Sequence, residues 1–424
     1  MTNVETQKER IASAIGEAEF ILLGFPDVHG SIRGKALTLS AFEAAVRDGT
    51  QFTDLLLALD PTDHPITDYD RFGINTGAGD LRVRAEPDTL RELTWRLGWR
   101  VCIATPSWPD GSPCTLASRE VLKRVLADID YDTLAAFEYE IRLNDANGEP
   151  LSSGLSYSVG ETFRFDEFVT RLTPALRGLG IELGAVHTEA GPGLLELNIA
   201  PRPGLQAADD ATFLKMAVKE VAASLGLRAS FLAKTVPGEE GSSGHVHLSL
   251  WREGENAFDE AHGAAVAGIL DHLPAASLLL NPTVNSYKRL VPGYFAPVNV
   301  SWGIENRSCA LRVVPGSRIE CRRPGADANP YLALAALVAS AADGIRRNLD
   351  LPQPIVGDAS ARDDLPALPN SLESALRAFE QDAVLRGALG EEFSEYFMVS
   401  RAWELKAWQQ AVSDWERERY ERTV

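Results

Sequence analysis

Two histidines stand one residue apart in the segment GSSGHVHLSLW, residues 241–251. His245 and His247 alternate with Val246 and Leu248, and this alternation predicts a β-strand on which both histidines share one face. A pair of histidines on one strand face occurs in ordinary protein cores as well as in catalytic and metal sites. The pair therefore indicates chemistry only if other reactive side chains accompany it.

Three other segments place charged side chains on predicted strands. They are Glu138 and Glu140 in FEYEIRL, Glu189 and Glu196 in HTEAGPGLLELN, and Arg318, Glu320 and Arg322 in SRIECRRP. Taken singly, these patterns also fit a solvated strand face, a surface hairpin and a cross-strand charge ladder. Taken together, five glutamates and a histidine pair favour a hard divalent cation, because Mg²⁺ and Mn²⁺ prefer oxygen ligands with an occasional imidazole.

Arginines accompany these carboxylates. The long segment NPTVNSYKRLVPGYFAPVNVSWGIENRSCALRV adds Arg289, Arg307 and Arg312. Arginines beside metal ions indicate phosphate or carboxylate substrates, and phosphoryl transfer needs both kinds of positive charge. The sequence contains no GxxxxGK[ST] motif, so the chain is not a P-loop enzyme.

The composition sets the class of protein. Of 424 residues, 45% are hydrophobic and 24% are charged, as in globular proteins. The net charge of −19 argues against nucleic acid as a partner, because phosphate binding needs a basic face. Four cysteines form no CxxC pair, which predicts a reduced, cytoplasmic protein. The apolar run NPYLALAALVASAADGI is too short to span a bilayer, and no membrane partner is expected.

Strands and helices alternate in two blocks. FILLGFPDVHGSIRGKALTL predicts a hairpin, and SAFEAAVRDG predicts a helix with Ser40 as its N-cap and Gly49 as its stop. Residues 1–113 predict a small β-rich front domain, and residues 114–424 predict a large domain in which helices wrap an antiparallel sheet. The fold class is therefore α+β.

With these motifs in place, the chain closely resembles the glutamine synthetase family. The resemblance runs from about residue 20 onward and is strongest over residues 281–336, from NPTVNSYKRLVPGY to ANPYLALAAL. It implies a β-grasp-like domain over residues 1–113 and a catalytic domain over residues 114–424, whose curved antiparallel sheet forms a funnel covered by helices. It also implies a homo-oligomer, a dodecamer of two stacked hexameric rings.

The resemblance also implies ATP, and two to three Mg²⁺ or Mn²⁺ ions, in each active site. The expected ligands are Glu140, Glu189 and Glu196 for the first metal, and Glu138, His245 and Glu320 for the second. The expected nucleotide-binding residues are His247, Ser249, Arg312 and Arg318. The expected catalytic set is Arg307, Arg289 and Arg322, of which Arg289 and Arg322 also hold the carboxylates of glutamate.

Four positions depart from the family on the substrate side. Phe295 stands where members that use ammonia carry a glutamate, and Thr53 stands where they carry an aspartate that helps to bind ammonium. Glu240 replaces an asparagine that contacts glutamate, and Leu194 replaces a glutamine. We interpret Phe295, Leu194, Glu240 and Thr53 as substrate-binding positions that have changed while the metal residues stayed intact.

The expected activity is therefore that of an ATP-dependent carbon–nitrogen ligase. It joins glutamate, or a close analogue, to an organic amine through an acyl-phosphate intermediate and forms a gamma-glutamyl amide. Two alternatives remain: glutamine synthesis from ammonia, and a ring-forming protein without catalytic activity. The residue at position 295 distinguishes the first alternative, and the intact metal residues argue against the second.

Overall fold

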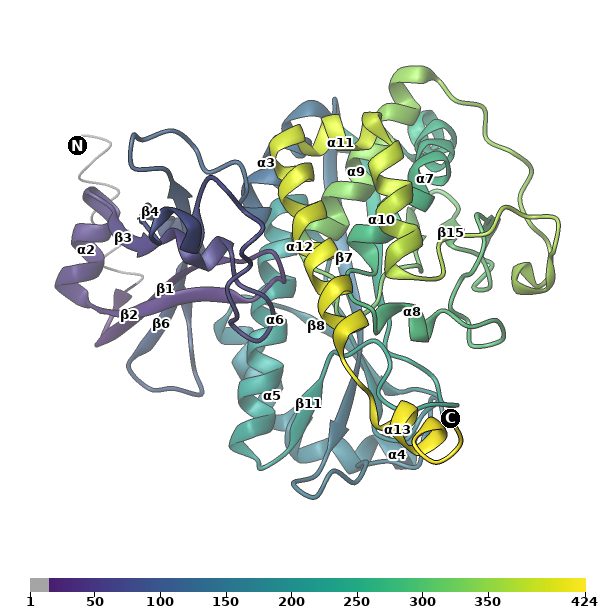
Figure 1. Cartoon of the computed structure of the whole chain (residues 1–424), viewed down its shortest axis with the longest axis horizontal. Helices are drawn as coiled ribbons and strands as arrows, with labels where there is room; N and C mark the ends of the chain where they lie inside the picture. Colours follow the sequence, from purple (N-terminus) through teal and green to yellow (C-terminus); the bar gives the residue numbers. More distant parts are fainter. Residues whose placement is uncertain (1–14) are drawn as a thin grey trace.

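The computed structural model describes residues 15–424 and contains two β-sheets joined by helices (Figure 1). The front sheet has the strand order β2-β1-β6-β4-β3, with β5 paired to β6. Its elements are β1 (Phe20–Pro26), β2 (Ile32–Thr38), α2 (Leu39–Arg47), β3 (Thr50–Thr53), β4 (Asp80–Ala85), β5 (Arg91–Glu92) and β6 (Trp99–Ser107). Short 3₁₀ turns lie at Asp54–Leu57, Gly73–Thr76 and Pro87–Thr89.

The predicted hairpin is confirmed, since β1 and β2 pair antiparallel in register from Phe20↔Thr38 to Pro26↔Ile32. The predicted helix is also present, but its N-cap was placed wrongly. Thr38, the last residue of β2, is extended and occupies the N-cap position of α2 without a side-chain hydrogen bond, so Ser40 lies inside the first turn. Because β2 continues directly into α2, no loop residue lies between them, and the N-cap position falls on the last residue of the strand.

The large sheet has the strand order β14-β15-β16-β12-β7-β9-β8, and three short strands pair beside this path. Its strands are β7 (Asp132–Asn144), β8 (Leu183–Thr188), β9 (Leu194–Ile199), β10 (Arg202–Pro203), β11 (Arg228–Ser230), β12 (Gly244–Arg252), β13 (Glu255–Asn256), β14 (Trp302–Ile304), β15 (Leu311–Val314) and β16 (Arg318–Cys321). Neighbours run antiparallel except β14 and β15, which are parallel. The α+β class predicted from the sequence is thus confirmed, with one parallel pair at the edge of this sheet.

Helices cover one face of the large sheet and extend beyond it (Figure 1). They are α3 (Ser118–Asp128), α4 (Val159–Thr162), α5 (Asp166–Gly178), α6 (Gly204–Ser224), α7 (Phe258–Leu280), α8 (Ser286–Arg289), α9 (Pro330–Arg347), α10 (Leu372–Gln381), α11 (Ala383–Leu389), α12 (Glu391–Gln410) and α13 (Asp414–Tyr420), with 3₁₀ turns at Phe163–Phe165 and Ala359–Ala361. In the described residues, the α7 segment Glu260–Leu280 is the one helix apolar and long enough to cross a membrane. Its most apolar window is 78% buried, as in the core helix of a globular protein.

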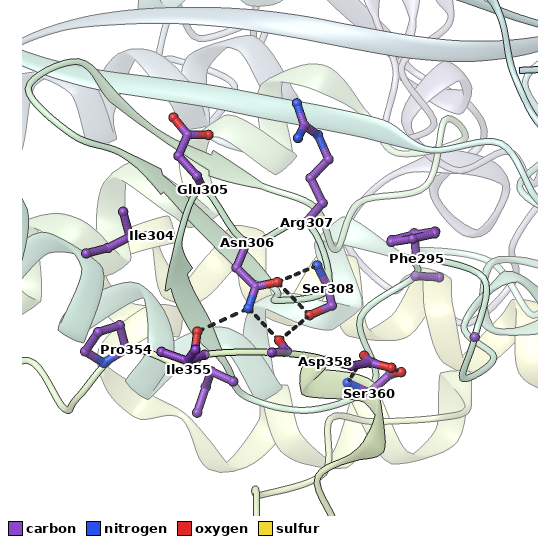
Figure 2. A pocket seen from close by; sticks show the side chains of 14 residues that line it. Phe295, Ile304, Glu305, Asn306, Arg307, Ser308, Pro354, Ile355, Asp358 and Ser360 are labelled. Atoms are coloured by element: carbon purple, nitrogen blue, oxygen red, sulfur yellow. Dashed lines mark hydrogen bonds between the residues drawn. The ribbon is translucent and has the colours of Figure 1, made fainter. Parts of the chain in front are cut away.

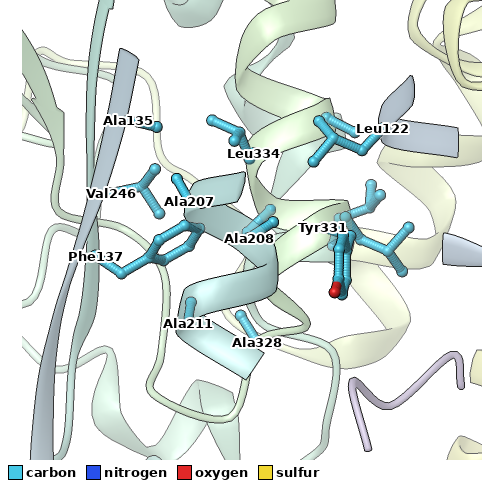
Figure 3. Close-up of a cluster of buried hydrophobic side chains, with 14 of the residues drawn as sticks. Leu122, Ala135, Phe137, Ala207, Ala208, Ala211, Val246, Ala328, Tyr331 and Leu334 are labelled. Atoms are coloured by element: carbon cyan, nitrogen blue, oxygen red, sulfur yellow. The ribbon is translucent and has the colours of Figure 1, made fainter. Parts of the chain in front are cut away.

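The alternation of β7 separates the core from the site. Ala135 and Phe137 point toward the helices, and the even-numbered Glu138 and Glu140 point to the opposite face. Figure 3 shows the core side, where the sheet packs against alanines of α6 and against α9. The packed side chains include Ala135, Phe137, Val246, Ala207, Ala208, Ala211, Tyr331 and Leu334. Because close packing fixes β7 and β12 against these helices, the polar face is held rigidly.

The front sheet is anchored at the beginning of α9. Asn329 caps this helix by accepting a hydrogen bond from the Tyr331 amide at 3.0 Å. The Asn329 amide group also donates to the backbone oxygens of Asp27 and Val28, in the turn of the β1–β2 hairpin. One side chain therefore ends the loop that precedes α9 and holds the front hairpin in place.

A buried histidine links the helices behind the sheet. His272 on α7 is 4% exposed, and its two ring nitrogens lie 2.6 Å from Asp382 and 3.0 Å from Asp343. Burial alone would lower the pKa of His272, but the hydrogen bonds with these two carboxylates raise it above 6.5. The same bonds outweigh burial at Asp343 and Asp382 and lower their pKa values.

His272→Ala is expected to lower the free energy of unfolding by about 3 kcal/mol, because it removes the cation that bridges two carboxylates and leaves Asp343 with Arg347 alone. Because the pKa of His272 is higher in the folded protein, its contribution to the free energy of unfolding is complete below the pKa of the unfolded state. That contribution is lost as pH rises through the folded-state pKa. The lowered aspartate pKa values give stability that is lost as pH falls. The deficit of the variant should therefore be largest between about pH 4 and 6.5 and should shrink toward pH 9.

Urea unfolding of both proteins at several pH values measures this difference. The control is His64→Ala, which removes an exposed histidine that lies 3.7 Å from Asp60. Such a surface pair contributes at most about 1 kcal/mol. A deficit of the His272 variant that is independent of pH would contradict the ionic role of this side chain.

Candidate active site

The register of the large sheet places the charged side chains in rows. His245 lies directly opposite Glu138, which lies opposite Asn198 on β9. In the next row, Glu140 lies opposite Glu196, which lies opposite His187 on β8. Directly opposed residues of antiparallel strands share a face, so five strands together build one polar surface.

Three neighbouring strands, β7, β12 and β16, contribute a group of ligands suited to a divalent ion. Glu138, His245 and Glu320 each offer one atom, and these atoms lie within 4.8 Å of one another. Nδ1 of His245 is 2.9 Å from Glu138 and 3.7 Å from Glu320. Burial would raise the pKa of Glu320, but the charges of His245 and Arg322 lower it to about 2. Two ionised carboxylates and one imidazole form a donor set that Mg²⁺ or Mn²⁺ accepts.

A second group contains His187, Glu189 and Glu196, whose ligand atoms also lie within 4.8 Å. His187 is 2.9 Å from Glu196 and 3.3 Å from Glu189. Burial would lower the pKa of His187, but these two carboxylates raise it to about 10. Glu140, which the resemblance assigned to this metal, instead accepts a hydrogen bond from the amide of Ser243 at 2.7 Å. A divalent ion fits this acidic group, and it would compete there with the proton on His187.

The arginines differ in whether their charge is already paired. Arg312 and Arg322 both donate to Glu320, and Arg322 also donates to the backbone oxygen of Arg307 at 2.9 Å. Arg307 itself forms no ion pair with any carboxylate in the described part of the chain. Its guanidinium group points away from the turn that carries it (Figure 2). Arg307 is therefore a cation available to an anionic substrate, and so is Arg318, which in the described residues donates to His247 and Ser317 and to no carboxylate.

Arg289 does not line the central cavity. It is 2% exposed, and it donates to the Ser243 hydroxyl at 3.2 Å and to the backbone oxygen of Arg323. Burial lowers the pKa of Arg289, and its Nε is buried without a partner. From behind the cavity wall, Arg289 supports the loop that leads into β12.

Two cavities meet on the polar face. The central cavity of about 560 Å³ is lined by both groups of metal-ligand candidates together with Arg307, Arg312 and Arg322. The second cavity, of about 390 Å³, is lined by His247, Ser249, Arg318 and Trp251 among others, and it shares Glu138 and Asn198 with the first. The phosphate-binding candidates are therefore divided between the two cavities. Arg307 and Arg312 line the central cavity, and His247 and Arg318 line the second cavity, whose wall includes Trp251.

The four departing positions lie in different places. Phe295 lines the central cavity with 63% of its surface exposed, and Glu240 lines the same cavity. Burial, together with the charges of Glu140 and Glu189, raises the pKa of Glu240 to about 7. Leu194 is 1% exposed and is not among the residues that line the central cavity.

Thr53 also lies apart from the central cavity, because it belongs to β3 of the front sheet. Its hydroxyl accepts a hydrogen bond from the amide of Leu55 and so caps the following turn. Within a single chain, Thr53 therefore has a local structural role.

Two residues of the site were not predicted as site residues. His187 alternates with Glu189 in the segment AVHTE, so its position on the shared strand face was visible in the sequence. Tyr157 stacks on His187 with ring centroids 4.1 Å apart, and it has a left-handed backbone with φ of +52°. No periodicity marks a loop residue such as Tyr157, because its place depends on the fold of the segment before α4.

This fold and this donor set define a class of ligase that uses a nucleotide and divalent metal ions. Residues 115–420 match the family model of the glutamine synthetase catalytic domain. A gamma-glutamylethanolamide synthetase of Streptomyces coelicolor is 36% identical over 95% of this chain and 92% of its own length. A glutamate–isopropylamine ligase of a Pseudomonas species is 32% identical, and the match covers 94% of each chain.

Relatives named as glutamine synthetases match to a similar degree. The glutamine synthetase of Thermococcus kodakarensis is 32% identical over 99% of both chains. Among solved structures, ligand-free GmaS superimposes with a TM-score of 0.87 at 28% identity, covering 97% of this chain and 98% of its own. The chain therefore belongs to the glutamine synthetase family, and it is a carbon–nitrogen ligase. Family membership implies the use of ATP and a divalent metal ion.

Proposed function

We propose that the protein joins the side-chain carboxylate of glutamate, or of a close analogue, to an organic primary amine and forms a gamma-glutamyl amide. The observation that carries this proposal is the exposed ring of Phe295 in the central cavity, beside intact metal-ligand candidates. An aromatic side chain offers an ammonium ion neither a counter-ion nor a base, but it contacts an alkyl group favourably. The two relatives named for ethanolamine and isopropylamine chemistry support this reading.

In the first step, a carboxylate oxygen of glutamate attacks the terminal phosphorus of ATP, and ADP leaves. Divalent ions held by Glu138, His245 and Glu320, and by Glu189 and Glu196, would neutralise phosphate oxygens. Arg307 carries an unpaired guanidinium group at the cavity wall, where it can bind the transferring phosphoryl group. The product of this step is an acyl phosphate, a mixed anhydride that is far more electrophilic than a carboxylate.

In the second step, the amine nitrogen attacks the acyl carbon, phosphate leaves, and the nitrogen loses a proton. The amine must be neutral to attack, so a carboxylate near the acyl carbon has to accept a proton. Glu240 and Glu189 line the central cavity, and the pKa of Glu240 is about 7. A carboxyl group with a pKa near neutrality is suited to accept that proton under physiological conditions.

Ammonia is the second candidate acceptor, because glutamine synthetases match the chain at a similar identity. A panel of amines separates the two readings when it is assayed with ATP, Mg²⁺ and glutamate by phosphate release and product mass. We expect slow turnover with ammonia and clear turnover with at least one hydrophobic primary amine. Saturable glutamine formation from ammonia, with no activity on any organic amine, would overturn the proposal.

Phe295→Glu should lower kcat/KM for the preferred hydrophobic amine about tenfold, since an alkyl group loses roughly 50 Å² of apolar contact at about 25 cal/mol per Å². The variant should gain relative activity with ammonia, because it restores a carboxylate. Phe163→Glu is the matched control, since Phe163 is 71% exposed and lies outside the central cavity. Equal losses in both variants would show that the effect does not arise at the acceptor site.

The proposal also includes a dodecamer in the cytoplasm. Thr53 lies in the front sheet and away from the central cavity of its own chain, which leaves it able to face the cavity of a neighbouring subunit. All four cysteines are buried and unpaired, as a reducing compartment allows. Light scattering of the purified protein tests the assembly.

A further inference from the structure

A third cavity borders the central cavity, and two residues line both of them. It has a volume of about 760 Å³ and is lined by Phe295, residues 304–308, residues 354–358 and Ser360 among others; we call it the side groove (Figure 2). Phe295 and Arg307 line both the side groove and the central cavity. The groove and the central cavity are therefore adjacent at these two side chains.

The walls of the side groove are fixed by hydrogen bonds. Asn306 donates to the backbone oxygens of Ile355 and Gly357 at 3.1 and 2.8 Å, as Figure 2 shows. Ser308 donates to Asn306 at 2.7 Å and accepts from the amide of Ala359 at 2.9 Å. The turn after β14 is thereby joined to the loop that follows α9. A pre-formed pocket of this size suits a small molecule, because little ordering is needed when the ligand binds.

The surface of the groove is largely apolar. Ile304 is 54% exposed and Val356 is 89% exposed, and Pro354 and Ile355 lie beside them. The two carboxylates at the groove already have partners: Glu305 accepts from Arg312 at 2.8 Å, and Asp358 accepts from Ser360. The wall formed by Ile304, Pro354, Ile355 and Val356 therefore favours hydrocarbon.

The backbone at the junction with the central cavity is unusual. Phe295 has φ of +50°, a left-handed conformation that costs a residue with a Cβ roughly 1–2 kcal/mol. This conformation holds the ring at the border of both cavities (Figure 2). The stem of Arg307 leads from the groove toward its guanidinium group, so apolar atoms continue from one cavity into the other.

We propose that the side groove binds the hydrocarbon chain of the amine acceptor, while the nitrogen stays in the central cavity. Ile304, Ile355 and Val356 are then the residues that set the preference for chain length. This inference rests on the proposed function, since it requires that an organic amine is the acceptor. Continuity through Phe295 and Arg307 is what favours a substrate chain over a second copy of the protein as the occupant.

A series of linear alkylamines from ethylamine to hexylamine tests the proposal on the complete enzyme. Each methylene buried in the groove should raise kcat/KM about fourfold until the groove is filled. Val356→Trp fills the groove and should lower the ratio of kcat/KM for hexylamine to that for ethylamine by about tenfold or more. Ile304→Asp should lower the same ratio by placing a charge on the apolar wall.

Val384→Trp is the matched control, because Val384 is an exposed valine on α11 outside the groove and should leave the ratio unchanged. An unchanged ratio in both groove variants would overturn the inference while leaving amine ligation intact. A changed molar mass by light scattering without a changed ratio would also overturn it, since the groove would then be a contact between subunits. Failure of every amine would instead contradict the proposed function itself.

Discussion

Glu320→Ala is expected to reduce the rate of phosphate release about 10³-fold, since a loss of about 4 kcal/mol of charge stabilisation corresponds to that factor. Glu320 is 1% exposed, and it is the carboxylate on which His245, Arg312 and Arg322 converge. Its removal takes one ligand from the proposed metal site and leaves Arg322 without its carboxylate partner, while Arg312 keeps its pair with Glu305. Phosphate release is measured with saturating glutamate and amine, and Mg²⁺-dependent ATP binding is measured by calorimetry.

Two further variants distinguish an effect of the lost charge from an effect of misfolding. Glu320→Gln keeps the shape of the side chain and removes its negative charge, so it should lose nearly as much activity as the alanine variant. Glu220→Ala removes a surface glutamate paired with Arg96, and it should leave turnover unchanged. Near-normal turnover of either Glu320 variant would remove this residue from the metal site.

The strands that carry the reactive residues could be predicted because alternation is a local property. Glu138 and Glu140 alternate with buried aromatic residues on β7, and His245 and His247 alternate with Val246 on β12. The sequence could not show which residue of β12 lies opposite which residue of β7. That register depends on how the loops between distant strands close and on how α6 packs beneath the sheet.

The substrate side was harder to predict, because it is formed by loops. Leu194 was interpreted as a wall of the amine pocket, since it replaces a polar residue of the family. The structure shows it buried at the start of β9, beneath the turn that contains Gly191. Phe295 was interpreted in the same way, and there the structure places an exposed ring in the central cavity. Replacement by an apolar residue cannot distinguish a pocket wall from core packing, because both positions accept hydrophobic side chains.

The two groups of metal-ligand candidates differ in how closely their residues match those expected from the sequence. The residues predicted for the second metal, Glu138, His245 and Glu320, lie close together on three neighbouring strands. For the first metal, the structure brings His187 to Glu189 and Glu196, while Glu140 lines the same cavity and stays a predicted ligand. A protonated histidine and a divalent ion satisfy the same pair of carboxylates, so the arrangement of this group depends on which cation is bound.

Arg307→Lys is expected to lower kcat by a factor of about 10²–10³, the usual cost of losing one well-placed donor to a transition state. Lysine keeps the positive charge, but it loses the planar pair of N–H groups that binds two phosphate oxygens at once. Because the Arg307 guanidinium has no carboxylate partner in the described residues, its charge is available to substrate. The free energy of unfolding should therefore change little while kcat falls.

Steady-state kinetics of the Arg307 variant should be measured for ATP, glutamate and amine separately. A residue that acts on the transferring phosphoryl group lowers kcat more than it raises any KM, because its contact is strongest in the transition state. Arg346→Lys, at an exposed arginine paired with Asp128, is the matched control and should leave kcat unchanged. A decrease of less than about threefold in kcat, set against the roughly 10² expected of a transition-state donor, would remove Arg307 from the catalytic residues.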